Sequence, residues 1–267
     1  MDLQLSGHTA LVTGSTSGIG AAIARSLAAE GAAVIVHGRD HQRAADVCAA
    51  IASAPGRAAA VVGDLGTDIG AARVAEGASL AFGLVDILVN NAGGYENTAW
   101  STAEPDDWLA VYNTNVVSAV RLVRLLTPAM RGAGWGRVIQ ISSGEGTRPF
   151  ANMPDYSATK AAMNNVTVSL AQDLAGSGVT ANTVSPGIVV TAGVEQFYRQ
   201  VAAREGWGDD WAQIEAGVLR TVLPNSVGRL GRPEEVASLV TFLASPLSGY
   251  IDGANLRVDG GATSTVN

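Results

Sequence analysis

Short apolar runs alternate with stretches of helical spacing along the chain, and this alternation restricts the possible folds more than any other feature. Chains that alternate strands with helices form parallel sheets covered by helices on both faces. We therefore expect an α/β fold built on one such sheet. The expected strands span residues 8–13, 32–37, 57–63, 85–89, 136–141, 179–185 and 255–258.

A glycine-rich turn joins the first expected strand to a helical pattern over residues 21–30. The turn reads Gly14-Ser15-Thr16-Ser17-Gly18-Ile19-Gly20. Glycines let a backbone approach a pyrophosphate, and a helix N-terminus offers free N–H groups and the positive end of its dipole. The spacing is Gly-x-x-x-Gly-x-Gly rather than Gly-x-Gly-x-x-Gly, so a plain strand–helix turn is the alternative. The strand–turn–helix context predicts a dinucleotide site.

The end of the second expected strand bears on the choice between NAD and NADP. NAD sites place an acidic residue there for the ribose 2′-hydroxyl. Here the chain reads His37-Gly38-Arg39-Asp40. A glycine in place of the acid removes repulsion of a 2′-phosphate, and Arg39 adds a guanidinium that can pair with it. We therefore favour NADP(H) over NAD(H). The alternative takes Asp40 as the ribose ligand and Arg39 as a solvated surface charge.

Small and polar residues follow the next two strands. Asp64-Leu65 ends the third strand at the level where an adenine ring would lie. Asn90-Asn91-Ala92-Gly93-Gly94 follows the fourth strand. Its asparagines can tie neighbouring strand ends together, and its small residues leave room for a ribose and a nicotinamide. A simple loop is the alternative.

Tyr156 and Lys160 lie four residues apart in a helical pattern, which puts them on one helix face. A free tyrosine has a pKa of about 10, and a nearby ammonium lowers it. General acid–base catalysis works best when the pKa lies near the operating pH. The pair therefore predicts proton transfer to or from a substrate oxygen, although such a spacing also occurs in ordinary surface pairs.

Two further polar residues precede this pair. Ser143 follows the fifth expected strand and lies thirteen residues before Tyr156, so its hydroxyl can hold a substrate oxygen against the tyrosine. Asn115 lies within a long helical stretch over residues 104–130, where asparagine is slightly unfavourable. It indicates either a bend or satisfied buried amide, or a polar link that carries protons between Lys160 and solvent.

Composition excludes several classes of protein. A net charge of −7 and a pI near 4.9 argue against a nucleic-acid partner. We find no apolar run long enough to span a membrane and no signal peptide. The lone Cys48 excludes an intramolecular disulfide and fits a cytoplasmic protein. The three histidines lack metal-ligand spacing, so we expect no catalytic metal.

The longest connection between expected elements spans residues 187–225 and has an irregular pattern. A long connection at the carboxyl edge of a parallel sheet is the natural lid over a substrate. We find no interdomain linker, so residues 1–267 are expected to form a single dinucleotide-binding and catalytic domain. The aromatic residues of the expected lid are Phe197, Tyr198, Trp207 and Trp211.

In this order and at these spacings, the motifs resemble the short-chain dehydrogenase/reductase family across nearly the whole chain. The resemblance implies a single Rossmann-like doubly wound sheet of seven mainly parallel strands with helices on both faces. It also implies a homotetramer packed through the helices near 104–130 and 155–176. The motifs are Thr13-Gly14-x-x-x-Gly18-x-Gly20, Asp64, Asn90-Asn91-Ala92-Gly93, Asn115, Ser143, Tyr156-x-x-x-Lys160, Pro186-Gly187 with Thr191, and Val258-Asp259-Gly260-Gly261.

The resemblance also implies residue roles. Tyr156 would be the general acid–base, Lys160 would lower its pKa and bind the nicotinamide ribose, Ser143 would hold the substrate carbonyl, and Asn115 would anchor a proton relay. The implied coenzyme contacts are Gly14, Thr16, Ser17, Gly18, Ile19 and Gly20 at the pyrophosphate, Arg39 at the 2′-phosphate, Asp64 and Leu65 at the adenine, Asn91, Ala92 and Gly93 at the ribose, and Tyr156, Lys160, Pro186, Gly187, Val189 and Thr191 near the nicotinamide.

The implied activity is an NADP-preferring carbonyl reductase or alcohol dehydrogenase, which interconverts a ketone and a secondary alcohol by hydride transfer. The segment 229–237 looks most like the branch of 3-oxoacyl-carrier-protein reductases and bacterial ketoreductases. A carrier-protein reductase of fatty-acid elongation is one alternative, and a non-catalytic coenzyme-binding regulator is another. An acidic chain with uncharged residues at 175–178 disfavours an acidic carrier protein as the substrate. Glu145, Arg148 and the aromatic residues of the expected lid suggest instead a small polar or aromatic ketone.

Overall fold

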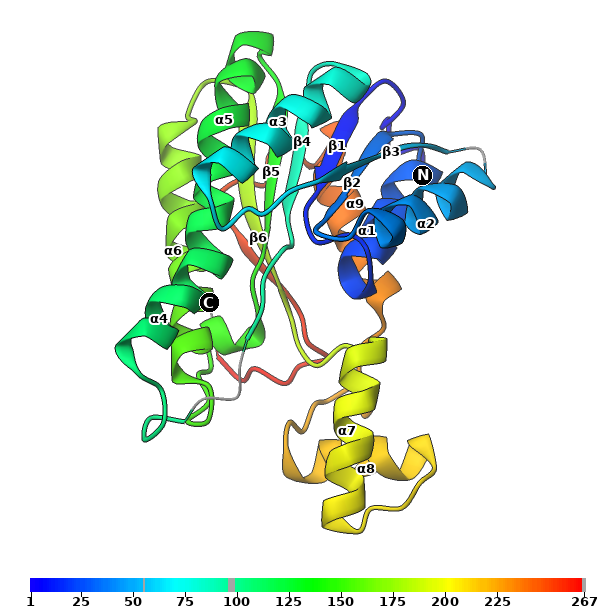
Figure 1. The fold of residues 1–267 in the computed structure, drawn as a ribbon, viewed down its shortest axis with the longest axis vertical. Helices are drawn as coiled ribbons and strands as arrows, with labels where there is room; N and C mark the ends of the chain where they lie inside the picture. Colours follow the sequence, from blue (N-terminus) through cyan, green and yellow to red (C-terminus); the bar gives the residue numbers. More distant parts are fainter. Residues whose placement is uncertain (55, 96–98, 266–267) are drawn as a thin grey trace.

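Seven parallel strands form a single sheet in the order β3-β2-β1-β4-β5-β6-β7 (Figure 1). The structure is a computed structural model that describes residues 1–54, 56–95 and 99–265. It confirms the expected α/β fold. The strands are β1 (Thr9–Val12), β2 (Ala33–Gly38), β3 (Arg57–Val62), β4 (Ile87–Asn90), β5 (Gly136–Ile141), β6 (Val179–Pro186) and β7 (Asn255–Val258).

Helices cover both faces of this sheet, and each face has its own apolar core. Neighbouring residues in β1 show why: Val12 packs into one core and Leu11 into the other, because side chains alternate along a strand. A strand buried on both faces must be apolar throughout. The first core includes residues of α1 (Gly18–Ala29), α2 (His41–Ala52) and α9 (Pro233–Ala244), and the second includes residues of α3 (Asp68–Phe82), α5 (Ser118–Ala133) and α6 (Pro154–Asp173).

The helical stretch expected over residues 104–130 is divided in three. It consists of α4 (Pro105–Tyr112), a π-helical turn (Asn113–Val117) and α5. The backbone N–H of Glu104 donates to the carboxylate of Asp107, which closes a capping box at the start of α4. Asn115 lies in the π-helical turn, a deviation that is often found at functional sites. No helix of the described residues is long and apolar enough to cross a membrane.

The connection over residues 187–225 is more ordered than its sequence pattern suggests. It holds two helices, α7 (Ala192–Glu205) and α8 (Trp211–Thr221), which stand below the sheet at the carboxyl ends of its strands (Figure 1). The expectation of an irregular connection was wrong, because these helices bury apolar residues against each other. Their core consists of Tyr198, Ala202, Ile214, Val218 and Leu230.

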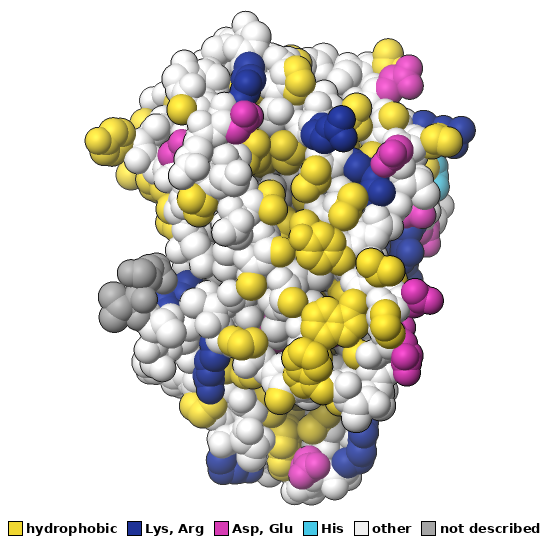
Figure 2. Space-filling model, turned by 90° about the vertical axis from the view of Figure 1, so that its left-hand side faces the viewer, with side chains coloured by type: hydrophobic (Ala, Val, Ile, Leu, Met, Phe, Trp, Pro, Cys, Tyr) yellow, Lys and Arg dark blue, Asp and Glu magenta, His cyan; other side chains and the backbone are white. Residues whose placement is uncertain are grey.

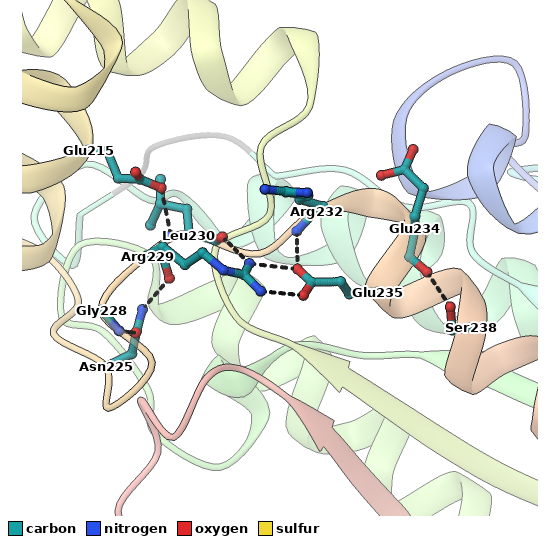
Figure 3. A network of polar contacts seen from close by, with 9 residues as sticks. All are labelled: Glu215, Asn225, Gly228, Arg229, Leu230, Arg232, Glu234, Glu235 and Ser238. Carbon is teal, nitrogen blue, oxygen red and sulfur yellow. Dashed lines mark hydrogen bonds and ion pairs between the residues drawn. The ribbon is translucent and has the colours of Figure 1, made fainter.

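A network of polar contacts joins the end of this helical pair to the start of α9 (Figure 3). The Arg229 guanidinium donates to both carboxylate oxygens of Glu235, at 2.9 and 2.6 Å. These contacts lower the pKa of Glu235 to about 2. The backbone N–H of Leu230 donates to Glu215 of α8, and the Asn225 amide donates to the Arg229 carbonyl. The exit of α8 is therefore fixed to the helix that covers the sheet.

Candidate active site

The predicted site residues meet at the carboxyl ends of β1, β4, β5 and β6. This is the edge at which open α/β sheets bind ligands. One cavity there brings together residues that the sequence analysis assigned to the coenzyme and to catalysis. Its lining includes Ile19, Asn91, Gly93, Ser143, Tyr156, Lys160, Pro186 and Gly187.

The glycine-rich turn has the geometry that an anion site needs. Gly14 and Gly18 have φ angles of 61° and 54°, which favour glycine. A Cβ on Gly20 would lie 2.4 Å from the Gly14 carbonyl oxygen, so no side chain fits there. Ser17 precedes α1 without accepting a side-chain capping bond, which leaves the first N–H groups of this helix available. The turn therefore fits the pyrophosphate of a dinucleotide.

His37 supports this turn from β2, a role that the sequence analysis missed. The Gly14 N–H donates to His37 Nδ1 at 3.2 Å, and His37 Nε2 lies 3.2 Å from the Gly63 carbonyl oxygen. The Ser15 hydroxyl accepts from the backbone N–H of His37. Burial lowers the pKa of His37, against a smaller opposing effect of the Gly63 carbonyl. The imidazole is therefore neutral, with its proton on Nε2.

At the end of β2, the two candidate residues for the coenzyme ribose differ in their contacts. Asp40 caps α2: its carboxylate accepts from the Arg43 N–H at 3.1 Å and lies 3.6 Å from the Arg43 side chain. Arg39 is exposed and makes no ion pair with another described residue. A Cβ on Gly38 would lie 2.4 Å from Thr16 Cγ2, so glycine lets the end of β2 approach the turn.

Asn91 ties the ends of β1 and β4 together, as the sequence analysis expected of its asparagines. Its side-chain amide donates to the carbonyls of Thr13 and Gly14, at 2.9 and 3.1 Å. The Thr13 hydroxyl accepts in return from the N–H groups of Asn91 and Ala92. Asn90 behaves differently: its side chain is buried and has no hydrogen-bond partner among the described residues.

The other predicted coenzyme residues lie at the same sheet edge. Asp64 is exposed just beyond β3, where its carboxylate accepts from the Gly66 N–H, and Leu65 is buried beside it. Val189 is buried after β6. Thr191 caps α7, and its methyl group would lie 3.1 Å from a Cβ on Gly18, so it is close to the glycine-rich turn.

Tyr156 and Lys160 share one face of α6, as their spacing predicts. Lys160 Nζ lies 5.4 Å from the centre of the Tyr156 ring and donates to the Ile141 carbonyl at 2.9 Å. The Ser142 hydroxyl donates to the Lys160 carbonyl, which holds α6 against the end of β5. Ser143 lines the same cavity as Tyr156 and Lys160, and its hydroxyl opposes the rise in the pKa of Tyr156. The fifth strand and α6 thus position all three predicted catalytic groups.

The protonation of this pair differs from the sequence expectation of a lowered tyrosine pKa. Burial raises the pKa of Tyr156 well above 10, and the Glu145 carboxylate adds to the rise, whereas the bond with Ser143 opposes it. Burial lowers the pKa of Lys160 to about 8, against the effect of Glu145. Burial has the largest effect on the Tyr156 pKa, so Tyr156 is a protonated phenol at neutral pH.

Asn115 joins the loop after β4 to α6. Its Oδ1 accepts from the Gly94 N–H at 2.8 Å, and its Nδ2 donates to the Gly94 carbonyl and to the Thr159 hydroxyl. The Thr159 hydroxyl donates to the Tyr156 carbonyl. The side chain therefore fits the interpretation as a satisfied buried amide. Thr159 has a positioning role that no sequence pattern indicated.

A second cavity adjoins the first beyond Ser143. Ser143, Pro186 and Gly187 line both cavities, so the two lie next to each other at these residues. Residues from distant parts of the chain complete the second cavity. They include Glu145, Arg148, Phe150, Ile188, Leu223 and Ala262.

A dinucleotide-type turn beside a Ser–Tyr–Lys constellation on a parallel sheet defines an oxidoreductase of the Rossmann-like class. The sequence pattern described as short chain dehydrogenase matches residues 8–202. The chain belongs to this family. It is 42% identical over 269 residues to the Bacillus subtilis protein named uncharacterized oxidoreductase YvaG, with all of both chains covered.

Two solved structures resemble the chain over almost its full length. L-sorbose reductase from Gluconobacter frateurii, complexed with NADPH and L-sorbose, has a TM-score of 0.94 and 33% identity, and all of both chains are covered. A 3-oxoacyl (acyl-carrier-protein) reductase from Agrobacterium tumefaciens with NADP bound has a TM-score of 0.87 and 38% identity, over 97% of this chain and 96% of that one. The Rossmann-like fold is therefore shared with enzymes that bind NADP(H).

Proposed function

We propose that the protein is an NADP-preferring carbonyl reductase that interconverts a ketone and a secondary alcohol. The observation that carries this proposal is the cavity beside the glycine-rich turn, which Ser143, Tyr156 and Lys160 line together. A coenzyme-binding protein without catalytic activity would need neither the Ser143 and Tyr156 hydroxyls nor a buried ammonium next to them. The alternative of a non-catalytic regulator is therefore disfavoured.

The chemistry of the chain follows from these groups. Ser143 and Tyr156 hold the carbonyl oxygen, and Tyr156 gives it a proton in reduction or removes one in oxidation. Lys160, with a pKa of about 8, is mostly charged at neutral pH and stabilises the phenolate that remains when Tyr156 has given up its proton. The nicotinamide coenzyme supplies or accepts the hydride when it is bound. Asn115 and Thr159 hold α6 so that these groups stay aligned.

The preference for NADP rests on the end of β2. Arg39 is exposed there, free of ion pairs within the described ranges, and can pair with a 2′-phosphate. Asp40 is occupied as the cap of α2, which disfavours it as the ligand of an NAD ribose. The NADP(H)-bound relatives agree with this choice.

We also propose that residues 187–225 act as the substrate lid of a single domain. Thr191 at the start of α7 lies against the glycine-rich turn, and Leu223 lines the second cavity. Burial raises the pKa of Tyr198 to about 12, with further increments from Tyr95 and Glu145, so this lid residue shares the electrostatic environment of the site.

A homotetramer in the cytoplasm completes the proposal. Figure 2 shows hydrophobic side chains gathered on the face over α4, α5 and α6. Exposed apolar residues on these helices include Leu109, Tyr112, Leu125 and Val168. Large exposed apolar patches mark interaction sites, and this one supports assembly through the helices that the family resemblance indicates. The lone Cys48 is unpaired, as suits a reducing compartment.

The Agrobacterium relative adds support to the carrier-protein alternative, but the basic residues of this chain do not favour it. Arg131 is paired with Asp173. Arg137 is buried, with its guanidinium stacked 4.7 Å from the centre of the Trp135 ring. Neither presents a free charge to an acidic carrier.

The proposal is tested by fluorescence titration with NADPH and NADH, followed by oxidation of each coenzyme with a panel of ketones and a carrier-linked 3-oxoacyl thioester. We expect tighter binding of NADPH and turnover of free ketones. Preferential turnover of the thioester would support the carrier-protein alternative. Tight coenzyme binding without turnover of any carbonyl compound would support the regulator.

A further inference from the structure

The second cavity contains an acidic side chain whose placement next to the reacting oxygen calls for a hydroxylated substrate. Resting on the proposed function, we infer that Glu145 accepts a hydrogen bond from a substrate hydroxyl close to the ketone, and that the substrates are neutral polyhydroxylated ketones. Glu145 is thereby a specificity-determining residue.

The backbone fixes Glu145 to the catalytic serine. The Ser143 hydroxyl accepts from the Glu145 N–H at 3.2 Å, at the start of the short helical turn Gly144–Gly146. A substrate carbonyl held by Ser143 therefore lies within a few bonds of the Glu145 side chain. Groups on the carbons next to that carbonyl are the ones that can reach it.

The side chain is held just as firmly from α6. Ser157, which directly follows Tyr156, donates its hydroxyl to Glu145 Oε2 at 2.8 Å. Ser157 itself is 2% exposed, so this tether is shielded from water. The other oxygen of the carboxylate, Oε1, has no hydrogen-bond partner within the described part of the chain, and the residue lines the second cavity.

The charge of Glu145 determines which kind of substrate group can donate a hydrogen bond to Oε1. Burial raises the pKa of Glu145, and the bond from Ser157 and the charge of Lys160 only oppose that rise. Glu145 is half-buried, and a substrate in the cavity would displace water from Oε1, so a substrate hydroxyl that donates to Oε1 compensates for the lost water. An alkyl chain provides no donor, and a substrate carboxylate at this position would meet a like charge.

The remaining walls suit a short polar molecule. Arg148 is anchored by a bond to the Ala262 carbonyl at 3.0 Å and lies 5.9 Å from the centre of the Phe150 ring. Its guanidinium can donate to hydroxyls farther from the ketone. Ile188 and Leu223 provide limited apolar contact. The bound L-sorbose of the Gluconobacter relative is a molecule of this chemical class.

The test compares ketones of one chain length with NADPH as the reductant: 2-butanone, 1-hydroxy-2-butanone, 1,3,4-trihydroxy-2-butanone and acetoacetate. We expect kcat/KM to rise about 100-fold from 2-butanone to the trihydroxy compound, with acetoacetate poorest, because a hydrogen bond to a charged group contributes about 1.5–3 kcal/mol. Glu145→Gln keeps the shape but removes the charge, and should reduce the preference for hydroxylated ketones about tenfold.

Two controls separate this role from a structural one. Ser157→Ala removes the tether but leaves the carboxylate, so it should reduce the preference less than Glu145→Gln does. NADPH affinity, measured by fluorescence, should be the same in wild type and both variants. If Glu145→Gln lowers activity toward all ketones equally, Glu145 is a structural residue and the inference is wrong.

The outcomes also separate this inference from the proposed function. Equal kcat/KM for 2-butanone and the hydroxylated ketones, or preference for acetoacetate, overturns the polyhydroxylated substrate class while the carbonyl reductase stands. Absence of turnover with every ketone, despite NADPH binding, overturns both. A hydroxyl preference that Glu145→Gln reduces supports both.

Discussion

The proposed coenzyme side and the proposed substrate side of Tyr156 are built in different ways. On the coenzyme side, backbone groups and glycines of neighbouring strand ends form the surface. Hydrogen bonds with the side chains of Asn91 and His37 hold this surface in place. On the substrate side, side chains from the segments 144–150, 188–223 and 259–262 converge on one cavity. The first surface is defined by local sequence, whereas the second depends on how distant segments fold together.

The sharpest test of this difference is a pair of glycine substitutions. A Cβ on Gly20 would lie 2.4 Å from the Gly14 carbonyl oxygen, whereas a Cβ on Gly144 meets its nearest neighbour at 3.4 Å. We expect Gly20→Ala to cost about 1–3 kcal/mol of stability and to abolish measurable NADPH binding. Gly144→Ala should change stability by less than about 0.5 kcal/mol and leave NADPH binding intact.

Thermal unfolding and NADPH fluorescence measure both effects. Equal tolerance of the two substitutions would break the comparison, because it would mean that the turn does not depend on close backbone approach.

Arg39 sharpens the account of the coenzyme side. Loss of a charge-assisted bond to the 2′-phosphate should weaken NADPH binding about 10- to 100-fold in Arg39→Ala, and NADH binding should change little. Arg43→Ala is the matched control, because Arg43 is also exposed but pairs with Asp40. Titration with both coenzymes measures the ratio. An equal loss for NADPH and NADH would assign Arg39 a structural role.

The smallest expected effect is a change of stability with pH that depends on His37. Because burial lowers its pKa below the ordinary value of 6.5, the folded protein resists protonation that the unfolded chain accepts. The contribution of the neutral imidazole to stability is complete above pH 6.5 and is lost as the pH falls toward the lowered pKa. The midpoint of thermal unfolding should therefore decrease on acidification below pH 6.5.

The variant His37→Asn provides the control. Its amide oxygen can accept from the Gly14 N–H as His37 Nδ1 does, but it does not titrate. We expect a smaller pH dependence of the unfolding midpoint in this variant. Identical pH profiles for wild type and variant would show that His37 protonation is not linked to folding.

Sequence patterns predicted the sheet and the close approach of the glycine-rich turn to the end of β4. Glycine at positions 14, 18 and 20 has a local geometric cause, and Asn91 ties strand ends that follow adjacent apolar runs. Tyr156 and Lys160 are related by helical periodicity alone. These features depend on short stretches of chain, so they could be interpreted before the fold was known.

Features that depend on distant segments were missed. His37 contacts Gly14 and Gly63 from a strand between them, and Thr159 meets Asn115 across two helices. The helices α7 and α8 were expected as an irregular connection because their apolar residues pack mainly on one another. The spacing of Tyr156 and Lys160 led us to expect a lowered Tyr156 pKa, whereas burial raises it. Burial cannot be judged from spacing.

The most direct test of the central claim is Tyr156→Phe, with turnover and NADPH binding measured on the same preparation. The substitution keeps the ring and removes the proton donor. The account predicts that kcat for ketone reduction falls about 100- to 10,000-fold, the usual contribution of a general acid, while NADPH still binds. Turnover close to that of the wild type would contradict the account, because another group would then supply the proton.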